Sequence, residues 1–243
     1  MGSVRNLGLM VGASGIALLA ASGCGSVKHG ENNANLIVGK QQFVAKCGAC
    51  HVLARAETKG TVGPNLDVAF ANSLKDGLGR TSIRSVVQGQ VEYPNPVGSM
   101  PKGLASGTSL NDIAAYVEAA ADRPGKDTGL LASAVAPAGA GKPAEEKAGK
   151  LELEAAPGGQ LAYTAAKATA KAGAVTIVMK NTSGVVHNVA IQPGTNGAVI
   201  GASPLVPKGT DTFSVTLKPG TYTYFCQAPG HRAAGMVGTL TVK

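Results

Sequence analysis

The stretch YFCQAPGHRAAGM, from Tyr224 to Met236, places three soft metal-ligating side chains on one short segment. Cys226, His231 and Met236 follow one another at equal spacing and offer a thiolate, an imidazole and a thioether. Such a set suits copper rather than calcium or magnesium, but a blue-copper site also needs a second histidine. The stretch is therefore either an incomplete copper site or an ordinary loop beside a strand, and only the rest of the chain can decide between them.

The sequence around this stretch predicts β-structure. Between Leu151 and Lys243, runs rich in β-branched and aromatic residues are separated by Gly, Pro and Asn. That pattern is typical of an all-β sandwich built from short strands. We therefore expect the quoted stretch to leave the end of one strand of this domain.

Counting the histidines supplies the missing ligand. The chain has 4 His; His51 belongs to a second motif, His29 lies in a polar segment, and His187 stands in SGVVHNVAI, just before a predicted strand. A buried free cysteine with a histidine nearby is the alternative interpretation. The favoured prediction is one type 1 copper, bound by His187, Cys226, His231 and Met236.

The second motif is CGACH, from Cys47 to His51, which has the spacing of a c-type haem attachment site. Residues three and four apart share a face of a helical turn, so Cys47 and Cys50 can reach one haem while His51 faces its iron. A disulfide or a zinc pair is the alternative, but no second cysteine pair completes a zinc site. Met100, in the Gly/Pro-rich loop NPVGSMPKG, is the predicted second axial ligand of this single covalent haem c.

Two further segments complete the predicted domain organisation. Residues 36–123 predict a small all-α domain, in which SLND from Ser109 resembles a capping box before an amphipathic helix. Residues 124–150 contain mostly Ala, Gly, Pro and charged residues without an aromatic side chain, which is typical of a flexible linker. As a free coil this linker would span about 30 Å, enough to let two domains dock or separate.

The N-terminus predicts export. Residues 1–23 combine Arg5 with a mostly apolar run that is short for a membrane span, so they are interpreted as a signal peptide. Gly23-Cys24 after small residues resembles a bacterial lipobox, which predicts lipidation of Cys24 and a polar tether over 24–35. The expected location is the extracytoplasmic face of a bacterial membrane, held by lipid; the alternative is a secreted or periplasmic soluble protein.

Residues 36–123 resemble a class I cytochrome c. Gly39 and Phe43 before the haem motif, GPNL from Gly63 after it, Met100-Pro101 and the helix that holds Tyr116 carry this resemblance. The resemblance implies an all-α cytochrome c fold. It also implies that the carbonyl group of Pro64 accepts a hydrogen bond from the free ring nitrogen of His51 and so orients this ligand.

Residues 151–243 resemble the cupredoxins of the plastocyanin/azurin type, on VMKNTSGVVHNVAI and LKPGTYTYFCQAPGHRAAGMVGTLTV. The resemblance implies a Greek-key sandwich. It also implies that Asn188 pins the loop that carries Cys226, and that His231 presents its ring edge at the protein surface. The chain would thus be an all-α cytochrome c domain followed by an all-β cupredoxin domain.

These assignments predict a membrane-tethered electron carrier rather than an enzyme. The partners would be membrane respiratory complexes or other redox proteins. The formal net charge of +8 becomes +7 once Arg5 is removed (22 − 1 = 21 Lys and Arg against 14 Asp and Glu), and no Lys/Arg block indicates nucleic-acid binding. The alternatives are a copper-delivery protein with a redox haem and, with fewer spare histidines than it needs, a copper–haem reductase.

Overall fold

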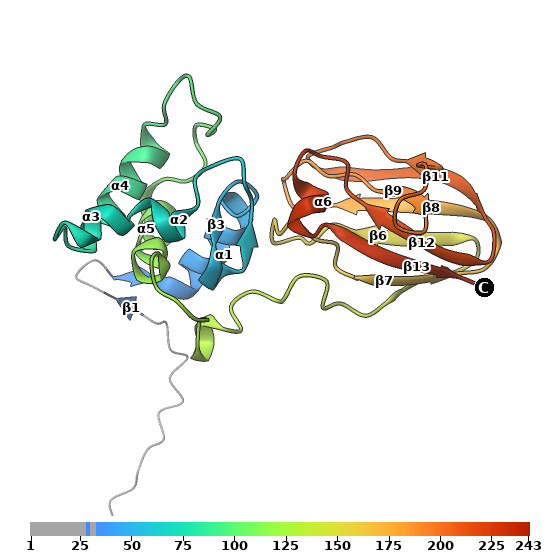
Figure 1. The fold of residues 1–243 in the computed structure, drawn as a ribbon, viewed down its shortest axis with the longest axis horizontal. Helices are drawn as coiled ribbons and strands as arrows, with labels where there is room; N and C mark the ends of the chain where they lie inside the picture. Colours follow the sequence, from blue (N-terminus) through green and yellow to red (C-terminus); the bar gives the residue numbers. More distant parts are fainter. Residues whose placement is uncertain (1–27, 30–32) are drawn as a thin grey trace, which may run out of the picture.

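The computed structural model describes residues 28–29 and 33–243, and the chain forms a helical domain and a β-sandwich that lie side by side (Figure 1). The predicted signal peptide (1–23), Cys24 and most of the predicted tether lie outside these residues. Within the described part of the chain, no helix combines the length and hydrophobicity needed to cross a bilayer.

The helical domain follows the expected α-rich pattern. The first long helix, α1, starts at Leu36, where the side chain of Asn35 caps it by accepting hydrogen bonds from the backbone of Ile37 and Val38. The elements of this domain are β1 (Lys28–His29), β2 (Ala34–Asn35), α1 (Leu36–Lys46), β3 (Val52–Leu53), η1 (Ala54–Ala56), β4 (Thr58–Lys59), α2 (Leu66–Ala69), α3 (Ala71–Lys75), α4 (Thr81–Glu92) and α5 (Gly107–Ala120).

Helices α1 and α5 cross at the centre of this domain. A β-carbon on Gly39 would collide with the backbone of Asp112, so glycine allows the two helices to approach this closely. Phe43 and Tyr116 pack between them, with ring centroids 6.2 Å apart. The capping box expected at Ser109 is wrong, because α5 already begins at Gly107. The carboxylate of Asp112 instead accepts a hydrogen bond from the backbone of Asn35.

The β-sandwich encloses a second hydrophobic core between two sheets. One sheet has the strand order β10-β9-β12-β13-β7-β5 and the other β11-β8-β6. The alternating burial along β6 and β8 puts every second side chain of these two strands into the core. The elements are β5 (Ala144–Glu145), β6 (Lys150–Glu154), β7 (Lys167–Ala170), β8 (Gly173–Asn181), β9 (Ala190–Pro193), β10 (Gly201–Ala202), β11 (Gly209–Leu217), β12 (Gly220–Phe225), α6 (His231–Ala234) and β13 (Val237–Val242).

The segment 124–150 differs from the flexible coil that its composition predicts. Its first part, with the short helix η2 (Gly129–Leu131), lies against the helical domain, where Asp127 is buried in an ion pair with Lys40. Its last part joins the sandwich, because β5 pairs with β7 in parallel. Both parts are ordered by partners far away in sequence, which composition alone does not reveal.

Candidate metal and cofactor sites

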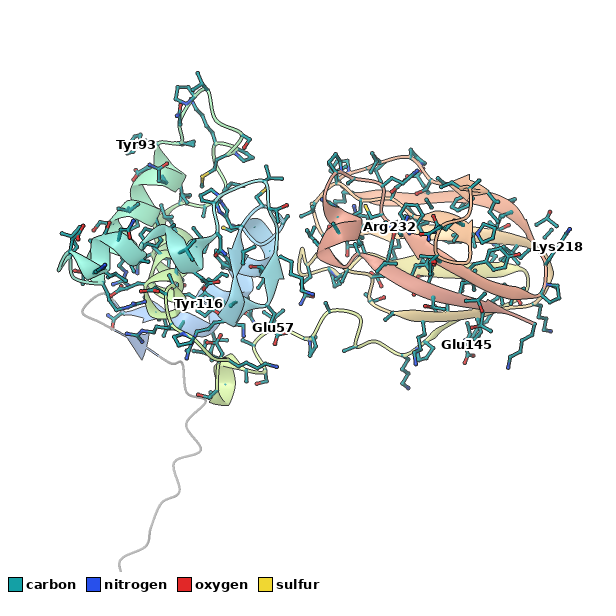
Figure 2. The ribbon with its side chains drawn as sticks, viewed as in Figure 1. Glu57, Tyr93, Tyr116, Glu145, Lys218 and Arg232 are labelled. Atoms are coloured by element: carbon teal, nitrogen blue, oxygen red, sulfur yellow. The ribbon has the colours of Figure 1, made fainter. Side chains whose placement is uncertain are left out.

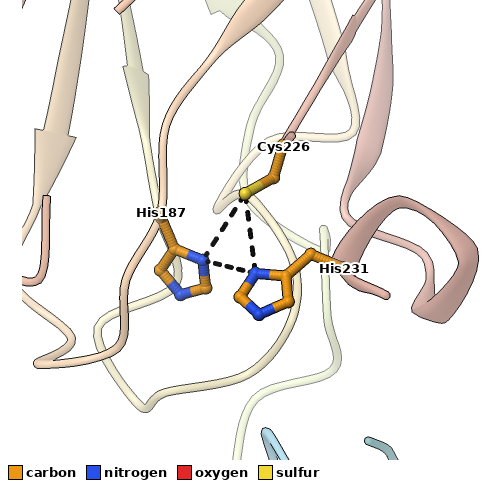
Figure 3. Close-up of side chains that lie close together, drawn as sticks. All are labelled: His187, Cys226 and His231. Carbon is orange, nitrogen blue, oxygen red and sulfur yellow. Dashed lines mark hydrogen bonds between the residues drawn. The ribbon is translucent and has the colours of Figure 1, made fainter. Parts of the chain in front are cut away.

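Three potential metal ligands meet at the end of the sandwich that carries α6. The Nδ1 atoms of His187 and His231 are 3.1 Å apart, and the Sγ atom of Cys226 lies 3.9 Å from the first and 3.5 Å from the second (Figure 3). A point equidistant from these three atoms lies about 2 Å from each, close to the bond lengths of transition metals with imidazole and thiolate. Within the described residues, this is the group of His, Cys, Asp or Glu side chains spaced to hold a metal ion.

The site is shielded from water on one side and open on the other. His187 is fully buried and Cys226 is 1% exposed, whereas His231 is partly exposed. Burial, and to a smaller extent the charge of His231, lowers the pKa of His187 to about 4. This low pKa favours the neutral imidazole, which is the form that binds a metal ion. Burial also raises the pKa of Cys226, against hydrogen bonds from the backbone of Asn188 and Ala228 that lower it. Metal binding must therefore release the thiol proton.

The ligands come from two segments that hydrogen bonds hold together. His187 forms an antiparallel bridge with Val206, with N–H···O distances of 3.0 Å in both directions. The side chain of Asn188 accepts a hydrogen bond of 2.8 Å from the backbone N–H of Gln227 and donates to the side-chain oxygen of Gln227 at 2.9 Å. Asn188 therefore ties the segment of His187 to the segment of Cys226.

The sequence analysis missed the support that Asn181, Ser203 and Gln227 give to this site. The carbonyl oxygen of Ser203 accepts from the Asn188 amide at 2.9 Å. The Asn181 amide donates to the carbonyl oxygens of Val185 and Val206, each at 2.8 Å, and so anchors the turn before His187. Asn181 and Ser183 in KNTSG are typical turn residues that could have signalled this turn, whereas nothing local marks Ser203 or Gln227.

Met236 directly precedes the last strand, β13, and is fully buried. Its backbone N–H donates to the carbonyl oxygen of His231 at 2.9 Å, and its carbonyl oxygen accepts from the Cys226 N–H at 3.1 Å. The loop from Cys226 to Met236 is thus closed by its own backbone, with α6 inside it. This closure keeps Met236 at the same end of the sandwich as the three other predicted ligands.

In the helical domain, CGACH forms a turn at the end of α1. The backbone N–H groups of Cys50 and His51 donate to the carbonyl oxygen of Cys47 at 3.0 and 2.9 Å. Both cysteines are free thiols, with Cys47 buried and Cys50 partly buried. Burial raises the pKa of Cys47 to about 12. The turn therefore holds two neutral thiols close in sequence to one imidazole.

The ring of His51 is oriented by the loop that follows. Its Nδ1 atom lies 2.9 Å from the carbonyl oxygen of Pro64. Because a carbonyl group only accepts, Nδ1 must carry the proton and Nε2 keeps its lone pair for a metal ion. A β-carbon on Gly63 would overlap the His51 ring, so glycine permits this contact. The donor set fits a covalently attached haem with His51 as an axial ligand.

Met100 lies partly buried in the loop between α4 and α5. Tyr93, at the outer end of α4, starts this loop and is 75% exposed (Figure 2). The loop also contains Val97, which is 91% exposed. The placement of Met100 opposite His51 stays a prediction.

Comparison with known families assigns the C-terminal part of the chain. Residues 150–243 match the family described as copper binding proteins, plastocyanin/azurin family. These residues therefore form a copper-binding domain of the cupredoxin type, and the His187, Cys226 and His231 group is the candidate copper site within it. No curated protein matches the chain.

Solved structures of copper proteins are similar to part of the chain. Dithionite-reduced auracyanin from the photosynthetic bacterium Roseiflexus castenholzii is 28% identical, covers 40% of this chain and 99% of its own, and has a TM-score of 0.37. Auracyanin A, a "blue" copper protein from the green thermophilic photosynthetic bacterium Chloroflexus aurantiacus, is 28% identical, with coverages of 39% and 98% and a TM-score of 0.35. Rusticyanin from Thiobacillus ferrooxidans is 21% identical, with coverages of 41% and 80% and a TM-score of 0.32.

Proposed function

We propose that this chain is a two-centre electron-transfer protein with one type 1 copper and one covalently attached haem c. The carrying observation is the triangle of His187, Cys226 and His231, two of them buried, in a domain that matches the copper-binding family. When bound, copper and haem iron each supply a one-electron redox couple. The chain holds these ligands on a hydrogen-bonded frame, which favours small rearrangement between oxidation states.

The burial of the copper ligands supports a carrier rather than an enzyme. His187, Cys226 and Met236 are at most 1% exposed, so they exclude water and leave no approach for a substrate. Only His231 reaches toward the surface. An imidazole edge at the surface suits electron exchange with a docked protein.

The contact between His51 and Pro64 supports the haem half of the proposal. It sets the proton on Nδ1 and leaves the lone pair of Nε2 free to bind a metal ion. Cys47 and Cys50 would attach the haem, and Met100 would complete its axial ligands. Ligation by His and Met favours a high reduction potential.

The location and partners are part of the same proposal. Lipidation of Cys24 would hold the chain on the extracytoplasmic face of a bacterial membrane, close to respiratory complexes or other redox proteins. The N-terminal sequence alone supports this part. Mass spectrometry of the N-terminal peptide from membranes tests it, and an unmodified peptide that starts after the signal would contradict lipidation.

The test of the two-centre proposal uses the purified full-length chain. We expect equimolar copper and haem, a haem that resists acid extraction, and two one-electron waves in a redox titration. Cys226→Ser should remove the blue copper absorbance and leave the haem, while the double variant C47S/C50S should do the reverse. A parent chain that holds copper but no covalent haem would refute the two-centre function.

A further inference from the structure

The sandwich faces the helical domain with the end that holds the copper ligands. Helix α6, which starts at His231, lies on the side nearest to β3 (Figure 1). Lys218 marks the opposite end of the sandwich, far from the helical domain (Figure 2). The two proposed redox sites are therefore on facing sides of their domains.

Two residues of the helical domain lie close to the loop that carries the copper ligands. A β-carbon on Gly230 would lie 3.8 Å from the Thr61 hydroxyl oxygen, and one on Gly235 would lie 3.9 Å from the Lys59 ammonium nitrogen. Gly230 directly precedes His231, the more exposed of the two histidines, and has a left-handed φ of 80° that starts α6. The contact thus falls beside the part of the site where electrons would enter or leave.

The receiving segment, Thr58 to Thr61, lies directly on the haem-attachment turn. A β-carbon on Gly60 would overlap the carbonyl oxygen of Ala49 and crowd the backbone nitrogen of Cys50 at 2.5 Å. One layer of backbone therefore separates the loop of His231 from Cys50.

A second contact closes the interface on the other side. A β-carbon on Gly159, in the loop between β6 and β7, would lie 2.5 Å from the carbonyl oxygen of Ala45. Gly159 is buried, and Ala45 lies in the last turn of α1, two residues before Cys47. Next to it, the Gln160 amide donates to the carbonyl oxygen of Ala136 at 2.7 Å.

The connecting segment is too short between its contacts with the two domains to allow a very different arrangement of these domains. Near its middle it contacts the helical domain through a hydrogen bond of 2.9 Å from Gln41 to the Ala134 carbonyl oxygen, and Val135 packs against the core of that domain. Its backbone pairs with the sandwich from Gly141, whose N–H donates to Thr164 at 2.8 Å. The few residues between them reach about 20 Å when fully extended, which is far less than a free linker of the whole segment would allow.

From these contacts we propose that the copper-ligand end of the sandwich docks on the haem-attachment turn of its own chain, in one fixed orientation. Thr61 and Ala45 form the receiving surface, and the Gly230 and Gly159 loops form the docking surface. The inference rests on the proposed function, since it names the partner surface of the same copper site. The two sites would exchange electrons within one chain without either domain swinging away.

The test places a bulky charge in the receiving surface of the full-length, fully loaded chain. Ala45→Arg fills the space that Gly159 occupies, and arginine is well tolerated in a helix. Thr61→Arg, in a loop, serves as a second variant in case the first does not fold. Ser85→Arg is the matched control, because Ser85 is exposed on α4 and lies outside both proposed sites.

Two measurements are made on each chain: small-angle X-ray scattering, and the rate of electron exchange between copper and haem after flash reduction. The parent should scatter as one compact particle and exchange electrons at a rate independent of protein concentration. Ala45→Arg and Thr61→Arg should broaden the distance distribution and slow the exchange at least about tenfold, since the fixed approach is lost. Ser85→Arg should behave as the parent.

Parent-like scattering and exchange in both folded interface variants would overturn the docking proposal. Exchange that rises with protein concentration would also overturn it, because electrons would then pass between chains. If the parent shows no exchange while the variants still change the scattering, the docking stands and the proposed function fails. The two ideas can therefore fail separately.

Discussion

Asp127 holds the connecting segment on the helical domain, and Asp127→Asn tests how strongly. Its side chain is 3% exposed and lies 3.0 Å from the Lys40 ammonium and 3.4 Å from the Arg55 guanidinium. The Tyr116 hydroxyl donates to it at 2.7 Å. Lys40 is itself buried and has one other partner, the Leu131 carbonyl oxygen at 2.8 Å.

The substitution keeps the shape of the side chain and removes its charge. Tyr116 can still donate to the amide oxygen, and Arg55 is 26% exposed and can turn to solvent. Lys40 is left as a buried cation with one carbonyl partner. Breaking a buried ion pair in this way costs about 3 to 5 kcal/mol, and the remaining partners place the expected loss at about 3 kcal/mol.

The assay is urea unfolding of the full-length chain, followed separately for the helical and β transitions because the two domains need not unfold together. Asp122→Asn, at an exposed carboxylate two residues before the connecting segment, is the control and should change stability by less than about 0.5 kcal/mol. In a Lys40→Met background the cost of Asp127→Asn should fall by about 2 kcal/mol. If Asp127→Asn lowers the free energy of unfolding of the parent chain by less than about 0.5 kcal/mol, the buried ion pair of Asp127 does not hold the connecting segment on the helical domain.

Four further predictions concern the two proposed sites. In the metal-free folded chain the pKa of His187 is about 4, whereas in the unfolded chain it is about 6.5. The free energy of unfolding should therefore fall by up to about 3 kcal/mol as the pH drops from about 6.5 to about 4. His187→Gln should flatten this pH dependence in unfolding curves. Asn188→Ala should destabilise the cupredoxin domain by about 2 to 4 kcal/mol and speed copper loss to a chelator, since buried partners lose their hydrogen bonds; unchanged melting would contradict this. Met236→Leu should raise the copper potential in voltammetry, because a sulfur donor to the oxidised ion is lost; a fall would exclude Met236 as a ligand. Met100→Ala should lower the haem potential and admit exogenous imidazole, and a spectrum indifferent to imidazole would argue for another axial ligand.

Local spacing was enough to predict the chemistry of the copper site. The ligand types of the loop from Cys226 to Met236 point to copper before any fold is known, because metal preference depends on donor atoms. His187 was found by counting, since a chain with 4 His leaves few choices. The structure then brings its Nδ1 to within 3.9 Å of the Cys226 sulfur.

Supporting residues were harder to predict because their partners are remote. Ser203 and Gln227 meet Asn188 only after the strands have assembled. The start of α5 was misplaced because a capping-box pattern at Ser109 is a local signal, whereas Asp112 is used to hold Asn35 from the other end of the domain. The residues next to such a side chain in the sequence do not show that it makes a long-range contact.

The amino-acid sequence alone determined the two kinds of donor set and the change from helical to strand periodicity, because each depends on neighbouring residues. Only the tertiary structure decided what the segment between the domains does. Its composition suits a free coil, but the charge of Asp127 is buried against Lys40 and the strand β5 completes a sheet edge. A segment is ordered by the partners it finds, and those partners lie elsewhere in the chain.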